Sequence, residues 1–74
     1  MIDTRIKKIF FSIFEDNDIN EETSIYNYEK WDSLSHAKII VALEKAFDIK
    51  LSFAEIILLT SVNNIQEYLS KKGL

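Results

Sequence analysis

The sequence predicts an all-α protein, a small four-helix bundle with a long first loop and a short third helix. Apolar residues recur at helical spacing through most of the chain. The 74 residues include one glycine and no proline, whereas a sheet protein of this size usually needs more glycines in its turns. Serine and aspartate stand where helices would begin. The length suits one domain, residues 1–74.

The first helix is expected from about Asp3 to Glu15, with Lys7 and Lys8 opposite its apolar side. Phe11 and Phe14 widen that side, which predicts packing against more than one neighbour. The apolar side consists of Ile2, Ile6, Ile9, Phe10 and Ile13.

The segment from Asp16 to Lys30 has no sustained period and is rich in turn-forming residues. Long loops in compact domains are usually functional or held down by contacts. We expect Ile19, Ile25 and Tyr26 to fasten this loop across the helix ends. Trp31 is predicted to be the last packing anchor before the second helix.

The second helix is predicted from Ser33 to about Phe47. One apolar stripe is assigned to the core and comprises Ile39, Ile40, Leu43, Ala46 and Phe47. A second stripe consists of Leu34, Ala37 and Val41. A helix that is apolar on two faces either lies at the centre of a bundle or presents one face to a partner.

Two shorter helices complete the bundle. Ile49 and Leu51 predict an extended link with both side chains pointing inward. Ser52 and Glu55 match a capping box, so the third helix starts there and reaches Leu58 or Leu59. Ser61 caps a fourth helix from Val62 to about Lys71, and Gly73 suits its C-terminal cap. The buried face of this helix is assigned to Val62, Ile65, Tyr68 and Leu69.

Composition excludes several functions. The net charge of −3 argues against nucleic-acid binding. The absence of cysteine excludes disulfides, thiolate metal sites and a cysteine nucleophile, and the lone His36 has no companion at metal-ligand spacing. The longest apolar run is too short for a membrane span, and no signal-type core is seen. We therefore expect a cytoplasmic protein without membrane insertion, and a monomer.

The stretch Trp31-Asp32-Ser33-Leu34 is the candidate functional site. Asp32 can cap the second helix, which places Ser33 in a first turn whose free N–H groups favour a phosphate ester. From these residues alone, a plain helix cap is the more common explanation. His36 follows one turn later, but a serine hydrolase is the least favoured hypothesis, because no group is available to orient the histidine.

Taken together, these features resemble the acyl carrier protein family over nearly the whole chain. The resemblance rests on Asp-Ser-Leu at 32–34, on Ala-Leu-Glu-Lys-Ala-Phe at 42–47, and on Thr-Ser-Val at 60–62. The first triplet alone is weak, but the three at these distances are specific. The preceding Trp31 is more similar to freestanding carriers of specialised pathways than to carriers of fatty acid biosynthesis.

The resemblance implies that Ser33, next to Asp32, carries 4′-phosphopantetheine installed from coenzyme A by a phosphopantetheinyl transferase. The thiol of the arm would hold acyl groups as thioesters, with aminoacyl cargo also open. The protein would then be a carrier and not an enzyme. Its partners would be that transferase, acyl-activating or acyl-transferring enzymes, and synthases.

The resemblance also suggests roles for apolar residues. Leu34, Ala37 and Val41 match positions that carriers present to partners. Positions that line an acyl cleft are matched by Leu43, Phe47, Leu51, Ile56, Leu59 and Ile65, for which ordinary core packing is equally consistent. An alternative function is an unmodified helical interaction module that uses the Leu34, Ala37 and Val41 face.

The chain departs from the family at three positions on the second helix. Ser35, Lys38 and Lys45 stand where acids are common in carriers, and Glu44 is the main acid of this helix. We therefore expect a weaker attraction to basic partner surfaces than is usual in the family.

Overall fold

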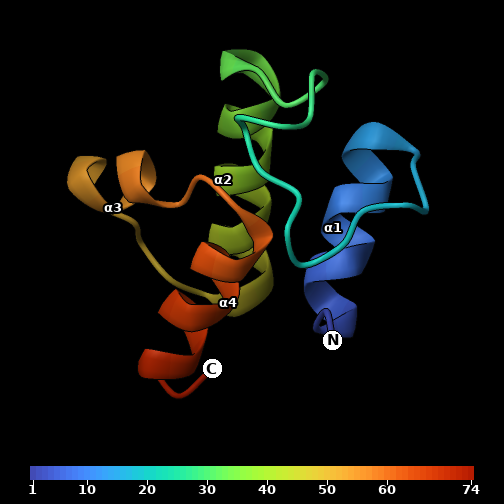
Figure 1. Ribbon diagram of the computed structural model, residues 1–74. Coiled ribbons are helices and arrows are strands. Elements are labelled where there is room, and N and C mark those ends of the chain that lie inside the picture. The colour runs from blue at the N-terminus through green and yellow to red at the C-terminus, as the bar shows by residue number, and fades with distance from the viewer.

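The computed structural model describes residues 1–74 and contains four helices, as predicted. These are α1 (Thr4–Phe14), α2 (Ser33–Phe47), α3 (Phe53–Leu58) and α4 (Val62–Lys71). In Figure 1, α2 stands in the middle with α1 and α3 on opposite sides, and both termini lie at the end away from the start of α2. No helix combines the length and apolarity needed to cross a bilayer.

Each helix starts at a side chain that accepts a backbone N–H of the first turn, namely Asp3, Asp32, Ser52 and Ser61. These local signals explain why the predicted bounds agree closely with the structure. At the other ends, Glu15 and Asp48 adopt left-handed backbone angles with φ of 53°, and Gly73 follows α4 with φ of 76°. The predicted glycine cap is therefore confirmed.

The core contains fifteen buried apolar residues, drawn from α1, α2, α4 and the connecting segments. Most of the predicted inward faces are confirmed, but two residues were assigned wrongly. Ala46 is exposed and Phe11 is 44% exposed. Their neighbours Phe47 and Phe10 point inward instead. Adjacent residues of a helix point in directions about 100° apart, so Ala46 and Phe11 turn towards solvent.

The loop between α1 and α2 is held mainly by backbone hydrogen bonds to the junction of α3 and α4. The Ile25 N–H donates to Thr60 O at 2.9 Å, and the Val62 N–H donates to Thr23 O at 3.0 Å. Ile19 is buried and Ile25 half-buried, as predicted, but Tyr26 is 85% exposed and fastens nothing. Its N–H donates to the Ser24 hydroxyl at 3.2 Å, in a local turn that leaves the ring outside.

No residue of α3 is fully buried. Polar contacts hold this helix instead, because the Tyr68 hydroxyl donates to Glu55 Oε2 at 2.7 Å and His36 bonds to Ile56 O at 3.0 Å. Leu51 in the preceding link is buried and Ile49 half-buried, as predicted. The Leu51 N–H donates to Glu44 Oε2 at 3.0 Å, so α2 holds the link that leads to α3.

Candidate functional site

Ser33 is the first residue of α2, and its side chain is exposed. Its hydroxyl makes no hydrogen bond within the chain, although the hydroxyl of Ser35 makes several. No acidic residue lies in the first turn of α2. The positive end of the helix dipole therefore faces a free hydroxyl, an arrangement that can stabilise an anionic group attached there.

Asp32 fixes the backbone at this end of α2. Its Oδ1 accepts the Ser35 N–H at 3.0 Å and the Ser35 hydroxyl at 2.9 Å. These hydrogen bonds, the backbone one first, lower the pKa of the Asp32 carboxyl below its ordinary value. Asp32 is thus a charged cap, as predicted, and the hydrogen bonds that close this turn leave the Ser33 side chain free.

Ser35 has a structural role that sequence analysis missed. It is buried, its single hydroxyl proton is shared between Asp32 Oδ1 and Lys30 O, which lies 2.8 Å away, and its oxygen accepts the Asp32 N–H at 2.9 Å. Asp32 and Ser35 therefore form a reciprocal capping box. The signal in the sequence was an aspartate followed three residues later by a hydroxyl, a variant of the serine–glutamate box recognised at Ser52.

His36 connects the site to the neighbouring helix. The Trp31 Nε1–H donates to His36 Nδ1 at 3.0 Å, and His36 Nε2 lies 3.0 Å from Ile56 O. Because the indole can only donate and the carbonyl can only accept, His36 is neutral with its proton on Nε2. Both ring nitrogens are occupied by these hydrogen bonds, so neither can act as a base towards the Ser33 hydroxyl. The serine hydrolase hypothesis is therefore wrong.

Trp31 is buried, as predicted, with 2% of its surface exposed. Its ring meets that of Phe10 edge-on, with centroids 5.2 Å apart, and its plane is inclined by 28° to the hydrogen-bonded ring of His36. The residue before the capped helix therefore packs against both α1 and α2. This packing fixes the direction in which the chain enters the Asp32 cap.

The second stripe of α2 is on the surface. Leu34 is 67% exposed, Val41 is 49% exposed, and Ala37 is also exposed. They lie along an open groove of about 390 Å³, which is lined by Leu34, Ala37, Lys38, Val41, Ala42 and Lys45. This second apolar face is not covered by another part of the chain, which fits contact with a partner.

The residues predicted to line an acyl cleft lie together in the core. Leu43, Phe47, Leu51, Leu59 and Ile65 are buried, and Ile56 is half-buried against them. None of the four hollows in the structure is lined by any of these six residues. They are closely packed here, so a chain that entered between them would have to separate side chains that now touch.

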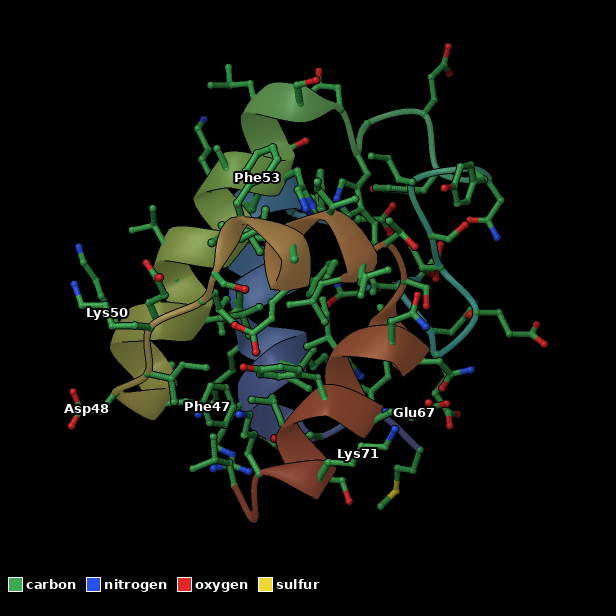
Figure 2. All side chains as sticks on the ribbon, turned by 90° about the vertical axis from the view of Figure 1, so that its left-hand side faces the viewer. Phe47, Asp48, Lys50, Phe53, Glu67 and Lys71 are labelled. Carbon is green, nitrogen blue, oxygen red and sulfur yellow. The ribbon has the colours of Figure 1, made fainter.

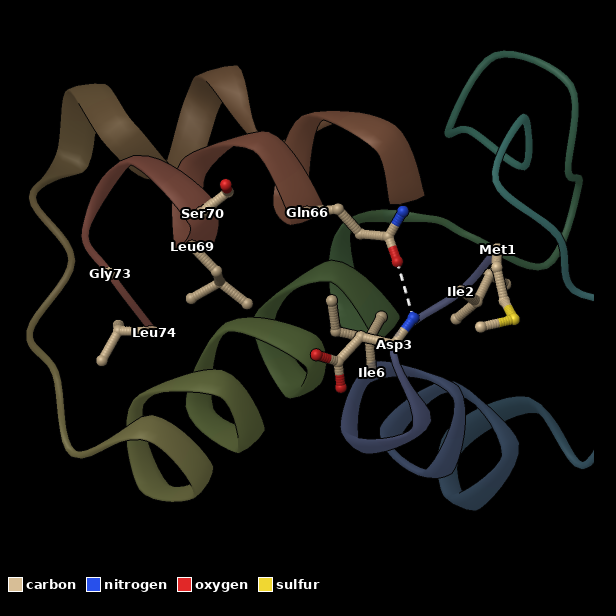
Figure 3. Close-up of a pocket in the computed structure, with 9 residues that line it drawn as sticks. All are labelled: Met1, Ile2, Asp3, Ile6, Gln66, Leu69, Ser70, Gly73 and Leu74. Carbon is tan, nitrogen blue, oxygen red and sulfur yellow. Dashed lines mark hydrogen bonds between the residues drawn. The ribbon is translucent and has the colours of Figure 1, made fainter.

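The largest hollow lies elsewhere, between the start of α1 and the end of α4 (Figure 3), and has a volume of about 400 Å³. The Asp3 N–H donates to Gln66 Oε1 at 2.7 Å across it. None of the predicted site residues lines this hollow. No group of three or more histidine and acidic side chains is arranged to hold a metal ion.

Comparison with known proteins agrees with this geometry. The family profile described as "Phosphopantetheine attachment site" matches residues 5–69. The chain is also 38% identical over 79 aligned positions to "Acyl carrier protein" from Buchnera aphidicola subsp. Acyrthosiphon pisum, in strains Tuc7 and APS. Each alignment covers 99% of this chain and 94% of the relative.

These matches establish what kind of protein this is. Its cofactor is a covalently attached 4′-phosphopantetheine. It is a carrier without catalytic activity of its own. With a profile match over most of its length and relatives aligned nearly end to end, the chain belongs to the acyl carrier protein family.

Proposed function

We propose that Ser33 carries the 4′-phosphopantetheine arm and that the protein delivers acyl intermediates, held on this arm as thioesters, to partner enzymes. The observation that carries the proposal is the contrast between two serines. Ser33 is exposed and its hydroxyl makes no hydrogen bond, whereas Ser35 is buried and its hydroxyl is hydrogen-bonded to Asp32 and Lys30. Of these two serines, only Ser33 offers an oxygen that can be esterified without opening the helix cap.

The residues around Ser33 fit a phosphodiester. The first turn of α2 contributes free N–H groups and no acid, and Asp32 is held towards Ser35 rather than towards Ser33. When bound, the arm supplies a thiol that forms the thioester with the cargo. The protein itself anchors the arm and orients it towards a docked enzyme. The tethered acyl group then reaches that enzyme at a high effective concentration.

The exposed face formed by Leu34, Ala37 and Val41 is the proposed docking surface for these enzymes. It begins one residue after Ser33 and follows the same helix, so an enzyme docked there has the arm beside it. We assign to it the phosphopantetheinyl transferase, acyl-activating or acyl-transferring enzymes, and synthases. We place this activity in the cytoplasm, with the protein as a monomer, in a fatty acid or specialised pathway with acyl or aminoacyl cargo.

The proposed site for a sheltered acyl chain is the group of packed side chains between α2 and α4. It comprises Leu43, Phe47, Leu51, Ile56, Leu59 and Ile65. The lack of a fully buried residue in α3 supports this proposal, because moving α3 outward would expose little apolar surface.

Loading by a phosphopantetheinyl transferase and coenzyme A, followed by intact mass, tests the attachment site. The wild type should gain the mass of one phosphopantetheinyl group, and Ser33→Ala should gain none while keeping its helical circular dichroism. Ser35→Ala is the matched control, being a second serine two residues away, and it should still be loaded.

Loading of Ser33→Ala would show that the wrong serine was chosen. A wild type that several transferases leave unloaded would contradict the carrier proposal. The unmodified interaction module would then be the better reading, with Leu34, Ala37 and Val41 as its binding face.

A further inference from the structure

The groove on α2 carries positive charge at its edges. Two of its six lining residues are Lys38 and Lys45, and no acidic residue lines it. Both lysines are exposed beside Leu34 and Val41. The groove is therefore an apolar strip bordered by ammonium groups, although the whole protein has a net charge of −3.

Glu44, the acid that lies between these two lysines in the sequence, does not neutralise the groove. It is half-buried, and its Oε2 accepts the Leu51 N–H at 3.0 Å, on the side of α2 that faces the link to α3. The other nearby acids cap the two ends of the helix. Asp32 is bonded to Ser35, and Asp48 extends away from the turn that follows α2 (Figure 2).

We propose that the partner surface that docks on α2 is an acidic amphipathic helix, with an apolar side chain for the groove and carboxylates that meet Lys38 and Lys45. This proposal rests on the proposed function, because it names the chemistry of the partner at the same docking surface. A basic partner surface would place like charges opposite both lysines. An acidic one pairs with them, while the aliphatic stems of the lysines extend the apolar contact.

The distribution of charge would also orient such a partner. The loop before α2 holds many of the acids, among them Asp16, Asp18 and Glu22. Interactions between exposed charges are screened over about 8 Å at physiological salt, so a partner docked in the groove meets mainly the charges of the two lysines. An acidic helix is then attracted to α2 and repelled from the loop, which favours one direction of approach.

The test uses two synthetic helical peptides with the same leucine stripe, one flanked by glutamates and the other by lysines. Each is titrated into the isotope-labelled protein, with and without the arm, and backbone NMR shifts are followed at low and physiological salt. The glutamate peptide should bind about tenfold more tightly at low salt, with shifts along the groove, and salt should narrow the difference. Leu34→Ala should weaken binding of both peptides.

Charge reversal supplies the decisive comparison. Lys38→Glu combined with Lys45→Glu should invert the preference between the peptides. Lys7→Glu combined with Lys8→Glu is the matched control, because it makes the same charge change beside the exposed Phe11 on α1. This control should leave the preference unchanged.

Three results would overturn the inference: equal or tighter binding of the lysine peptide, shifts confined to the Lys7, Lys8 and Phe11 region, or indifference to Leu34→Ala. Loading by the transferase is measured separately. A loaded protein without the peptide preference contradicts only the acidic partner. An unloaded protein with the preference contradicts only the carrier proposal.

Discussion

His36 Nε2 donates to the carbonyl oxygen of Ile56 across 3.0 Å and so joins α2 to α3. The opposite nitrogen of the same ring accepts the Trp31 Nε1–H at 3.0 Å. One neutral histidine therefore satisfies a buried indole and holds a helix that has no fully buried residue of its own. This ring and the Tyr68–Glu55 hydrogen bond together hold α3 in place.

His36→Ala should lower the free energy of unfolding by about 1–3 kcal/mol, because the buried Trp31 N–H loses its acceptor. Backbone amides in the middle of α4 should exchange faster only in proportion to this global loss of stability, whereas those of α3 should exchange faster still. Urea denaturation and hydrogen exchange provide the two measurements. Lys38→Ala, an exposed change on the same helix, is the control, and equal effects of the two substitutions would contradict the bridging role of His36.

The sequence was sufficient where structure depends on near neighbours. Helix starts were predictable because caps such as Ser52 with Glu55 act over three residues. Contacts between distant segments were not predictable, since no pattern near His36 points to Ile56 and none near Ser24 points to Ser61, its partner in an isolated bridge. Ser33 was identified from a local pattern, but its contrast with Ser35 required the structure.

Ser35→Ala should destabilise the fold by about 1 kcal/mol, because the first turn of α2 loses half of its capping box. Ser33→Ala should change stability by less than about 0.5 kcal/mol, since the hydroxyl that it removes is exposed and unbonded. Urea unfolding of the two unmodified variants measures this difference. If Ser33→Ala is the more damaging change, the Ser33 hydroxyl has a structural contact that this structure lacks.

The Tyr68→Phe variant should lose less stability than the wild type as the pH rises into the alkaline range. The hydrogen bond to Glu55, with burial second, raises the pKa of Tyr68 from 10.0 to about 12. A raised pKa contributes stability that is fully present below pH 10 and lost as pH rises towards 12. Phenylalanine keeps the ring beneath Lys72, so the comparison isolates the hydroxyl.

Urea unfolding at several alkaline pH values provides this measurement. The decline in stability between pH 10 and 12 should be shallower in the variant than in the wild type. Parallel curves would show that the Tyr68 phenol titrates alike in the folded and unfolded protein.

Asp32→Asn should alter the response to acid while leaving the fold intact at neutral pH, because asparagine caps helices about as well as aspartate. Hydrogen bonds to Ser35 lower the pKa of Asp32 below 3.8 in the folded protein. The charged form therefore adds stability above pH 3.8 that is lost as the pH falls through the lower folded value. As the pH falls below 3.8, the wild type should lose more stability than the Asp32→Asn variant. Urea unfolding at a series of acidic pH values measures this difference.

The proposed acyl site should respond to the length of the cargo. If a cargo chain enters between α2 and α4, lengthening it should raise the melting temperature of the loaded protein, because each buried methylene contributes roughly 0.8 kcal/mol. Separating the packed side chains opposes this gain, so an acetyl group should have little effect and an octanoyl group a clear one. Thermal unfolding of the protein bearing each acyl group measures the trend.

Two variants locate the effect. Val41→Ala changes the exposed face and should leave the dependence on chain length intact. Leu59→Ala enlarges the space among the proposed lining residues and should lower the stability of the unloaded protein by about 2–5 kcal/mol. An octanoyl group that fills this space should restore more stability in Leu59→Ala than it adds to the wild type. Equal increments in the wild type and in Leu59→Ala would place the cargo away from Leu59, and no increment at any chain length would place it outside the bundle.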